Sequence, residues 1–416
     1  MLQYNSLIES RLRLNIADYL LFFIAFFASW GTGLQTVSTF DLSKLFIIFS
    51  IFLIVYWCFF VKNKFIFPKY FNIFFIFAFV HTLIAYTLLF NNEFTFKYLE
   101  TIVLENGFVT IEEAVGLKIV RFFLFMLLGN ALASLIKETR QLRRFTFGYT
   151  LGVLSVILLG GYSSYTGSGY RLSGGFLNPN AFGLAGLTVT FFSLINYFYE
   201  NQKQILKTTF LSFSLLGICI ILMSGSRGTM LSLIIGLIVF FANTKTFRTV
   251  RIILVIILFS VLSLMLFEER ISATLAQRIS LLGEDRGAGR MDIWKDYLSE
   301  FPKYIFTGAG LHRSIEVIKN SYSVILKTTH NNYLRVLVEF GLLGLLFFIM
   351  GIKQIYKRLS RSKSYFSSGI KSLLIAWCVS SLFMDSLDSR TTWIILGITV
   401  AYSEILKKEI YRKQNE

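Results

Sequence analysis

The chain has 416 residues, of which 55% are hydrophobic, 17% aromatic and only 16% charged. Soluble domains carry about 25% charged residues, so this composition excludes an ordinary set of soluble domains. The formal net charge of +17 would suggest nucleic-acid binding in a soluble protein. In a membrane protein, basic residues instead gather in the cytoplasmic loops. The composition therefore indicates a polytopic membrane protein.

Long apolar runs recur along the chain, with short polar segments between them. About 20 apolar residues are enough to cross a bilayer as a helix, and lipid offers the backbone no other hydrogen-bonding solution short of a closed barrel. The pattern predicts an all-α polytopic membrane protein with about twelve transmembrane helices, near residues 16–33, 44–61, 69–90, 118–136, 145–162, 180–199, 208–223, 227–243, 250–267, 332–352, 369–384 and 391–406.

The basic clusters lie in every second loop between these predicted spans. The densest is Lys-Glu-Thr-Arg-Gln-Leu-Arg-Arg at residues 137–144. Because positive charges are retained in the cytoplasm, we predict that both termini are cytoplasmic. Anionic headgroups of the membrane lipids would favour the same loops. The positive charge is then a topology signal, and nucleic acid is excluded as a partner.

Two of the predicted outer segments are long, at about 91–117 and 268–331. The second is rich in arginine but also contains many apolar and aromatic residues, too many for disorder. Loops longer than about 15 residues are usually functional or disordered. We therefore expect a small, partly helical subdomain at 268–331, between nine spans in residues 1–267 and three spans with a cytoplasmic tail in residues 332–416.

The centres of the predicted spans are almost free of charge, unlike those of ion-coupled transporters and channels. The exceptions are His81 and the pair Arg335 and Glu339. The i,i+4 spacing of that pair predicts mutual neutralisation on one helix face, and we interpret His81 as a core histidine. Polar residues concentrate instead at the outer ends of the spans, so we expect the functional site to lie at the outer membrane surface.

Four clusters occupy these outer ends. In the first, Asn178 and Pro179 predict a helix cap and a first helical turn, which leaves Arg171 and Asn180 without a local explanation. The second, Ser-Gly-Ser-Arg-Gly at residues 224–228, places Arg227 at the start of a helix, where free backbone N–H groups attract anions. The third is Gly-Arg-Met-Asp-Ile-Trp at residues 289–294, and the fourth is His-Asn at 330–331 followed by Gly-Leu-Leu-Gly at 341–344.

Arginine and histidine on one membrane face suit a particular chemistry. Arginine grips phosphate oxygens with two parallel hydrogen bonds, and histidine can take a proton from a hydroxyl near neutral pH. A lipid-linked diphosphate donor and a sugar hydroxyl acceptor would use both. The sequence contains no Asp-x-Asp motif and no His, Asp and Glu residues at metal-ligand spacing. We therefore expect transfer without a metal or other cofactor, with arginine neutralising the leaving group.

These clusters resemble the O-antigen ligase and polymerase superfamily of bacterial membrane glycosyltransferases. His330-Asn331 with Gly341 and Gly344 is similar to the ligase pattern H-[NSQ]-x9-G-x-x-[GTY]. Arg227-Gly-Thr-Met-Leu231 is similar to its R-x3-L element, and Arg171-Leu-Ser-Gly with Asn178-Pro-Asn180 resembles a segment common to the superfamily. The resemblance runs from about residue 171 to 345, and the R-x3-L element gains its weight only from its position.

The resemblance implies en bloc transfer of a polysaccharide from undecaprenyl diphosphate to the lipid A core. The reaction would take place at the periplasmic face of the bacterial inner membrane, with residues 268–331 as a large periplasmic loop. By this resemblance His330 is the base, and Arg227 and Arg290 hold the diphosphate. Supporting polar or substrate-binding residues would be Arg171, Asn180, Asn331 and Asp385, with Asp388 a companion of Asp385 in orienting an arginine or the substrate.

Several alternatives stay open on the sequence alone. A polymerase of the same superfamily shares the motifs and uses a second lipid-linked glycan as acceptor, and the histidine pattern favours a ligase. Relatives that attach glycans to protein carry a larger C-terminal region. A flippase or transporter would require a cationic lumen at mid-depth, which the nearly uncharged spans do not provide. A structural scaffold would leave the arginine and histidine residues of the outer face unexplained.

Overall fold

The computed structural model describes residues 17–30, 43–61, 66–89, 111–160, 178–199, 203–244, 290–306, 308–313, 328–362 and 364–415, together with Ser173 and Phe176. Within these residues all regular secondary structure is helical. The all-α class predicted from the apolar runs is thus confirmed for the described part of the chain.

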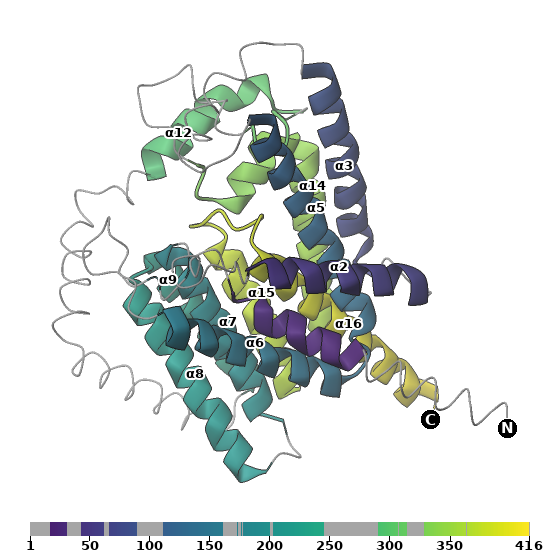
Figure 1. The fold of residues 1–416 in the computed structure, drawn as a ribbon, viewed down its shortest axis with the longest axis vertical. Coiled ribbons are helices and arrows are strands. Elements are labelled where there is room, and N and C mark those ends of the chain that lie inside the picture. Colours follow the sequence, from purple (N-terminus) through teal and green to yellow (C-terminus); the bar gives the residue numbers. More distant parts are fainter. Residues whose placement is uncertain are drawn as a thin grey trace.

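The helices form one bundle with α12 above it (Figure 1). A first helix spans Ala17–Phe27. The α-helices that follow are α2 (Ser43–Phe60), α3 (Lys69–Leu89), α5 (Ile111–Leu135), α6 (Thr139–Gly160), α7 (Pro179–Tyr197), α8 (Gln204–Ser224), α9 (Arg227–Thr244), α12 (Arg290–Glu300), α14 (Asn332–Leu359), α15 (Tyr365–Ser380) and α16 (Arg390–Asn415), and the short 3-10 helix η3 covers Phe301–Lys303.

Every predicted span except the ninth overlaps one of these helices. The ninth, at 250–267, lies outside the described residues. Within the described residues, six helices are long and apolar enough to cross a membrane: α3, α5, α6, α8, α9 and α14. The chain is a multi-pass membrane protein, and the count of twelve spans stays a prediction. At their C-terminal ends, α14 and α16 continue well past the predicted spans, to Leu359 and Asn415, because charged residues continue each helix beyond its apolar run.

Small residues bring α7 and α8 together in the bundle. A Cβ atom added at Gly217 would lie 2.7 Å from the carbonyl oxygen of Gly186, so the two backbones are in direct contact. Side chains of this size are what allow membrane helices to approach closely. Large apolar residues fill the rest of the core, and both Trp377 of α15 and Trp393 of α16 are fully buried.

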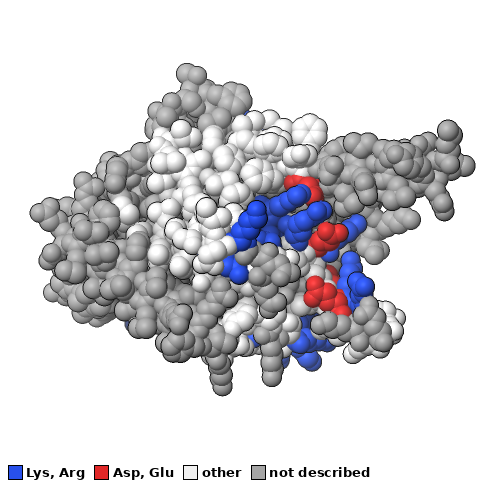
Figure 2. All heavy atoms as spheres, turned by 90° about the horizontal axis from the view of Figure 1, so that it is seen from below, with Lys and Arg blue, Asp and Glu red and all other residues white. Residues whose placement is uncertain are grey.

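The two ends of the bundle differ in their polar residues. At one end the interhelical contacts include Arg144 with Asp18, and Lys371 Nζ donating to Asn243 Oδ1 across 2.7 Å. Figure 2 views this lower end of the molecule and shows Lys and Arg side chains gathered beside a smaller number of Asp and Glu. The other end contains the first turns of α14, the segment 381–389 between α15 and α16, and α12.

Candidate functional site

The helix α14 breaks at Gly341, and the break builds the framework of the site. Gly341 has a φ of 69° and a ψ of −173°, which is not helical. A Cβ atom at this position would also lie 2.6 Å from the carbonyl oxygen of Phe306. Positive φ and close approach by another backbone both favour glycine. The first glycine of the sequence motif is therefore required by the local backbone.

Residues 305–306 and 308–310 lie at this break and replace the missing helical hydrogen bonds. The amide of Ala309 donates to the carbonyl oxygen of Val338 across 2.8 Å, and that of Gly310 donates to Glu339 across 3.0 Å. In the other direction the amide of Leu342 donates to Ile305 at 2.8 Å. Because buried backbone groups need partners, the loop and the broken helix stabilise each other, and residues 311–313 are brought beside the first turns of α14.

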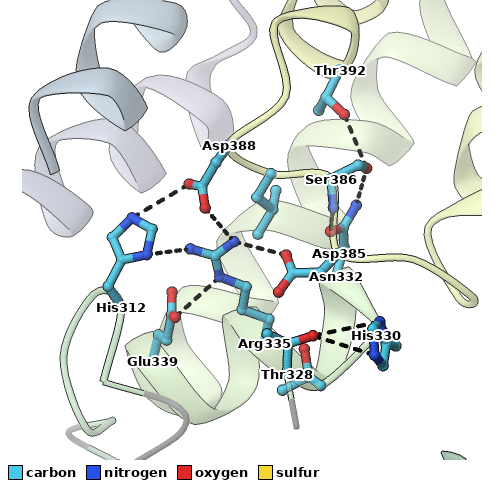
Figure 3. Close-up of polar contacts among 12 residues, drawn as sticks. His312, Thr328, His330, Asn332, Arg335, Glu339, Asp385, Ser386, Asp388 and Thr392 are labelled. Carbon is cyan, nitrogen blue, oxygen red and sulfur yellow. Dashed lines mark hydrogen bonds and ion pairs between the residues drawn. The ribbon is translucent and has the colours of Figure 1, made fainter. Parts of the chain in front are cut away.

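Arg335, one turn into α14, is the centre of a buried polar network (Figure 3). Its side chain is only 4% exposed. Nε donates to Glu339 Oε1 at 3.0 Å, and Nη1 donates to both Asp385 Oδ1 and Asp388 Oδ2 at 2.7 Å. Nη2 lies 3.2 Å from Nδ1 of His312. One guanidinium thus joins α14 to two segments that are distant in the sequence.

The contact with Arg335 decides the protonation state of His312. A guanidinium only donates hydrogen bonds, so Nδ1 must accept, and the imidazole proton lies on Nε2, 3.5 Å from Asp388 Oδ1. Burial lowers the pKa of His312 to about 4, against the opposing effect of the Asp388 carboxylate. His312 is therefore neutral at physiological pH and serves as an acceptor for Arg335.

The two aspartates of the network have different environments. Burial raises the pKa of Asp385, with the charges of Arg335 and, more weakly, His330 acting against it. Burial would also raise the pKa of Asp388, but Arg335 and His312 together lower it below the ordinary value. Asp388 is consequently ionised at neutral pH. The amide of Asn332, two residues after His330, donates to the carbonyl oxygen of Ser381 across 2.8 Å, so the segment that carries both aspartates lies close to His330.

His330 immediately precedes α14 in an unusual backbone conformation. Its φ is 48°, and His312 with 63° is the only other non-glycine residue with positive φ in the described part of the chain. Such conformations cost about 1–3 kcal/mol and are concentrated at functional sites. The Thr328 hydroxyl lies 3.4 Å from Nδ1 and 3.5 Å from Nε2 of the imidazole.

The two asparagines after His330 hold the start of α14 in place. Asn331 is the N-cap, and its Oδ1 accepts from the amides of Tyr333 at 2.9 Å and Leu334 at 3.1 Å, as expected for asparagine at this position. Asn332 binds the segment 381–389 instead. Its Nδ2 donates to the hydroxyls of Ser381 and Ser386, both at 2.9 Å, and its Oδ1 accepts from the Ser386 amide at 2.7 Å.

Arg290 is the first residue of α12, which packs on α14. Ile293 and Tyr297 of α12 are buried against Leu334 and Val338 of α14. Trp294, one turn after Arg290 on the same face, donates from Nε1 to the carbonyl oxygen of Thr329 across 2.9 Å. The helix that begins with Arg290 is therefore attached to the residue just before His330. The described residues of the segment predicted at 268–331 include the helices α12 and η3, and the subdomain as a whole stays a prediction.

Arg227 is the first residue of α9 and follows a tight turn. Gly225 ends α8 in the left-handed region with a φ of 58°, and the hydroxyl of Ser226 pairs with Thr229 at 2.9 Å. The turn packs on the segment 381–389, because a Cβ atom at Gly228 would lie 2.5 Å from Cβ of Phe383. Arg227 thus lies beside the segment that carries Asp385 and Asp388.

The remaining predicted residues are at the start of α7. Asn178 caps this helix by accepting from the amide of Ala181 at 2.8 Å, and Pro179 is in its first turn, so the predicted cap is confirmed. Asn180 lies half-buried on that first turn. Arg171 lies outside the described residues, so its expected role stays a prediction.

Two residues around the network, His312 and Asn332, could not be predicted from the sequence. The i,i+4 pair of Arg335 and Glu339 is confirmed, but it is not a complete explanation, because Arg335 also binds Asp385, Asp388 and His312. The orientation of an arginine by the two aspartates was expected, without the arginine being identified. Neither His312 nor Asn332 belongs to a recognisable motif; the available clue was an arginine near the start of an apolar helix with only one carboxylate nearby in the sequence.

A comparison with protein families matches residues 212–349 to the model of the O-antigen ligase family. The match covers most of α8, all of α9 and α12, and α14 as far as residue 349, so it contains Arg227, Arg290 and His330. No curated protein matches the chain. The family match and the bundle of apolar helices lead to one conclusion: this multi-pass membrane protein carries a domain of the O-antigen ligase superfamily.

Proposed function

We propose that the protein is an O-antigen ligase, a glycosyltransferase that moves a polysaccharide en bloc from undecaprenyl diphosphate to the lipid A core. The observation that carries this proposal is the position of His330. It precedes α14 in a strained conformation and lies within the matched domain. It is two residues before Asn332, whose side chain binds the segment of Asp385 and Asp388. A partly exposed imidazole beside a carboxylate is suited to remove a proton from a sugar hydroxyl.

In the proposed reaction, the acceptor hydroxyl attacks the anomeric carbon of the donor. A new bond forms from the hydroxyl oxygen to that carbon, and the bond from the carbon to the diphosphate oxygen breaks. The hydroxyl proton goes to His330, and the diphosphate leaves with the bonding electrons on its lipid carrier. A single displacement of this kind inverts the anomeric carbon. Asp385, on the segment that binds Asn332 just after His330, stabilises the imidazolium that forms.

Arg227 and Arg290 are the proposed ligands of the donor diphosphate. Arg227 begins α9 and Arg290 begins α12, and helix N-termini attract anions through their free N–H groups and dipole. The structure supports this role by attaching each of these helices to a neighbour of the site, α9 to Phe383 and α12 to Thr329. Guanidinium groups would neutralise the leaving group without a metal ion.

Arg171, Asn180 and Asn331 are proposed as supporting residues for the glycan or the donor. Oδ1 of Asn331 already accepts two amides of α14, which leaves its Nδ2 to face a substrate. Asn180 is half-buried at the start of α7. The acceptor in this proposal is a sugar hydroxyl of the lipid A core.

We further propose that the site faces the periplasm and that the protein lies in the inner membrane with cytoplasmic termini. This orientation is supported by basic side chains that lie at the end of the bundle opposite to His330. Arg358 and Lys371 lie at the end opposite to His330, since α14 begins just after His330 and ends at Leu359. Figure 2 shows the gathering of basic side chains at that lower end. Basic residues are enriched on the cytoplasmic side.

A complementation experiment tests the function. A strain lacking the gene is supplied with the wild-type chain or with His330→Asn. Its lipopolysaccharide is analysed on a gel, and its undecaprenyl-linked glycans are extracted. Asparagine is the chosen replacement because it tolerates positive φ. Long glycans on undecaprenyl together with bare lipid A core indicate a ligase. Single repeat units on both carrier and core indicate a polymerase. Unchanged pools in the deletion strain contradict both.

A further inference from the structure

We propose that Arg335 is a positioning residue for glycan transfer, which holds the carboxylate of Asp385 beside His330. This inference rests on the proposed function, in which His330 is the base. It concerns a residue that does not touch the substrate and that acts through Asp385. Figure 3 shows the arrangement, with Asp385 extending from the segment 381–389 toward the guanidinium, and with His330 beyond it.

The first reason is the geometry around the guanidinium. Arg335 is 4% exposed, and its Nη1 is shared by Asp385 Oδ1 and Asp388 Oδ2, both at 2.7 Å. The two aspartates are separated by two residues and belong to a segment without regular helix. Because both carboxylates accept a hydrogen bond from Nη1, they lie close to each other. This leaves Oδ2 of Asp385 without a hydrogen bond from the described residues.

The second reason is that the segment 381–389 has a separate, uncharged anchor. Asn332 binds Ser381 and Ser386 through three hydrogen bonds of its side chain. Leu387 is fully buried, and its carbonyl oxygen accepts from Trp393 Nε1 at 2.7 Å. The path of the backbone is therefore determined without Arg335. The guanidinium instead orients the two aspartate side chains and favours their ionised forms.

The third reason is the number of carboxyl groups around the guanidinium. Those of Glu339, Asp385 and Asp388 all contact Arg335. Buried ion pairs are rarely better for stability than apolar residues of similar size. The side chains of Glu339 and Asp385 are only 1% and 17% exposed, so stability alone does not explain why they gather around one arginine. Such a cluster is understandable if an ionised carboxylate is needed next to His330.

The fourth reason is that no other basic side chain could take this position. Arginine contacts Glu339, the aspartate pair and His312 through three different nitrogens. Lysine carries the same charge on one atom and lacks the planar fork. Replacement by lysine therefore keeps the charge of the site but releases at least part of the network, which makes Arg335→Lys the informative variant.

The experiment measures transfer by the purified full-length chain in detergent, with varied lipid-linked donor. A misplacement of about 1 Å costs about 10²-fold in turnover, so we expect Arg335→Lys to lower kcat by about that factor. The donor diphosphate is held elsewhere, so its KM should change by less than about threefold. The matched control is Arg358→Lys, which changes an interhelical salt bridge to Glu404 at the opposite end of α14 and should leave both constants unchanged.

Folding is checked by the thermal melting of each variant. If Arg335→Lys does not fold, Asp385→Asn tests the same inference, because the amide oxygen can still accept from Arg335 while the charge beside His330 is lost. Its kcat should fall with little change in KM. An Arg335→Lys variant with wild-type kcat, while His330→Asn is inactive, overturns the positioning role alone. Activity retained in His330→Asn instead removes the proposed base. A larger rise in donor KM than fall in kcat would place Arg335 in donor binding.

Discussion

The guanidinium of Arg335 donates to Nδ1 of His312 across 3.2 Å. This contact holds His312 in its neutral form, with the proton on Nε2 directed toward Asp388. It also ties the segment 308–313, which fills the break in α14, to the segment between α15 and α16. One buried arginine thus connects three parts of the chain around the proposed base, and several measurable consequences follow.

The first prediction concerns pH. His312 has a pKa of about 4 in the folded protein and 6.5 as its ordinary value. The unfolded chain therefore binds an additional proton between these values, and the free energy of unfolding falls as the pH drops from 6.5 to 4. At the low end of this range the loss amounts to roughly 3 kcal/mol.

The variant His312→Asn isolates this effect. Asparagine tolerates positive φ, and its carbonyl oxygen can accept from Arg335 where Nδ1 does, but it does not titrate. The melting temperature of the variant, measured in detergent from pH 7 to pH 4.5, should fall less steeply than that of the wild type. Parallel curves would show that the pKa of His312 in the folded protein is close to its ordinary value.

The second prediction concerns the break in α14. Gly341→Ala places a side chain at a φ of 69° and against the carbonyl oxygen of Phe306. The left-handed backbone alone should cost about 1–3 kcal/mol, and the disturbed contact with Phe306 and Gly308 should add to it. Gly116→Ala is the matched control, because nothing lies within 4 Å of the added Cβ atom and its φ is ordinary.

Melting temperatures of both glycine variants in the same detergent provide the measurement. Gly116→Ala should be neutral or stabilising by up to about 1 kcal/mol, since alanine favours the helix more than glycine does. Equal melting temperatures for the two variants would show that the backbone at Gly341 relaxes without cost.

The third prediction concerns the base. His330→Asn retains a residue suited to a φ of 48° but removes the proton acceptor. General base catalysis contributes about 10²–10⁴-fold, so transfer should fall by that factor while the melting temperature stays close to that of the wild type. If a folded His330→Asn protein transfers the glycan at the wild-type rate, a group other than His330 accepts the hydroxyl proton.

The fourth prediction concerns the donor. Arg227→Lys and Arg290→Lys keep a positive charge and lose the two-pronged contact with phosphate oxygens. The lost hydrogen bond to a charged group is worth about 1.5–3 kcal/mol, so kcat/KM for the lipid-linked donor should fall by about tenfold or more. Arg144→Lys, at the opposite end of the bundle beside Asp18, is the control. If all three variants have the same kcat/KM for the donor, neither Arg227 nor Arg290 binds its diphosphate.

Much of the fold could be predicted from the sequence because its determinants are local. A run of about 20 apolar residues specifies a membrane helix without any knowledge of its neighbours. The cap at Asn178 with Pro179 and the turn before Arg227 also involve residues adjacent in the chain. His330 and Gly341 could be identified by their spacing, although the spacing alone did not show why glycine is needed there.

Only the tertiary structure determined the partners of Arg335. In the sequence it has one carboxylate at i+4, and its other contacts lie 23 residues before it at His312 and 50 and 53 residues after it at Asp385 and Asp388. The sequence alone determined the helices and the candidate base, since hydrophobicity and capping act between near neighbours. The assembly of the site depends on the hydrogen bonds of Ile305, Ala309 and Gly310 to the broken α14, and such long-range pairing is set by the packing of the whole bundle.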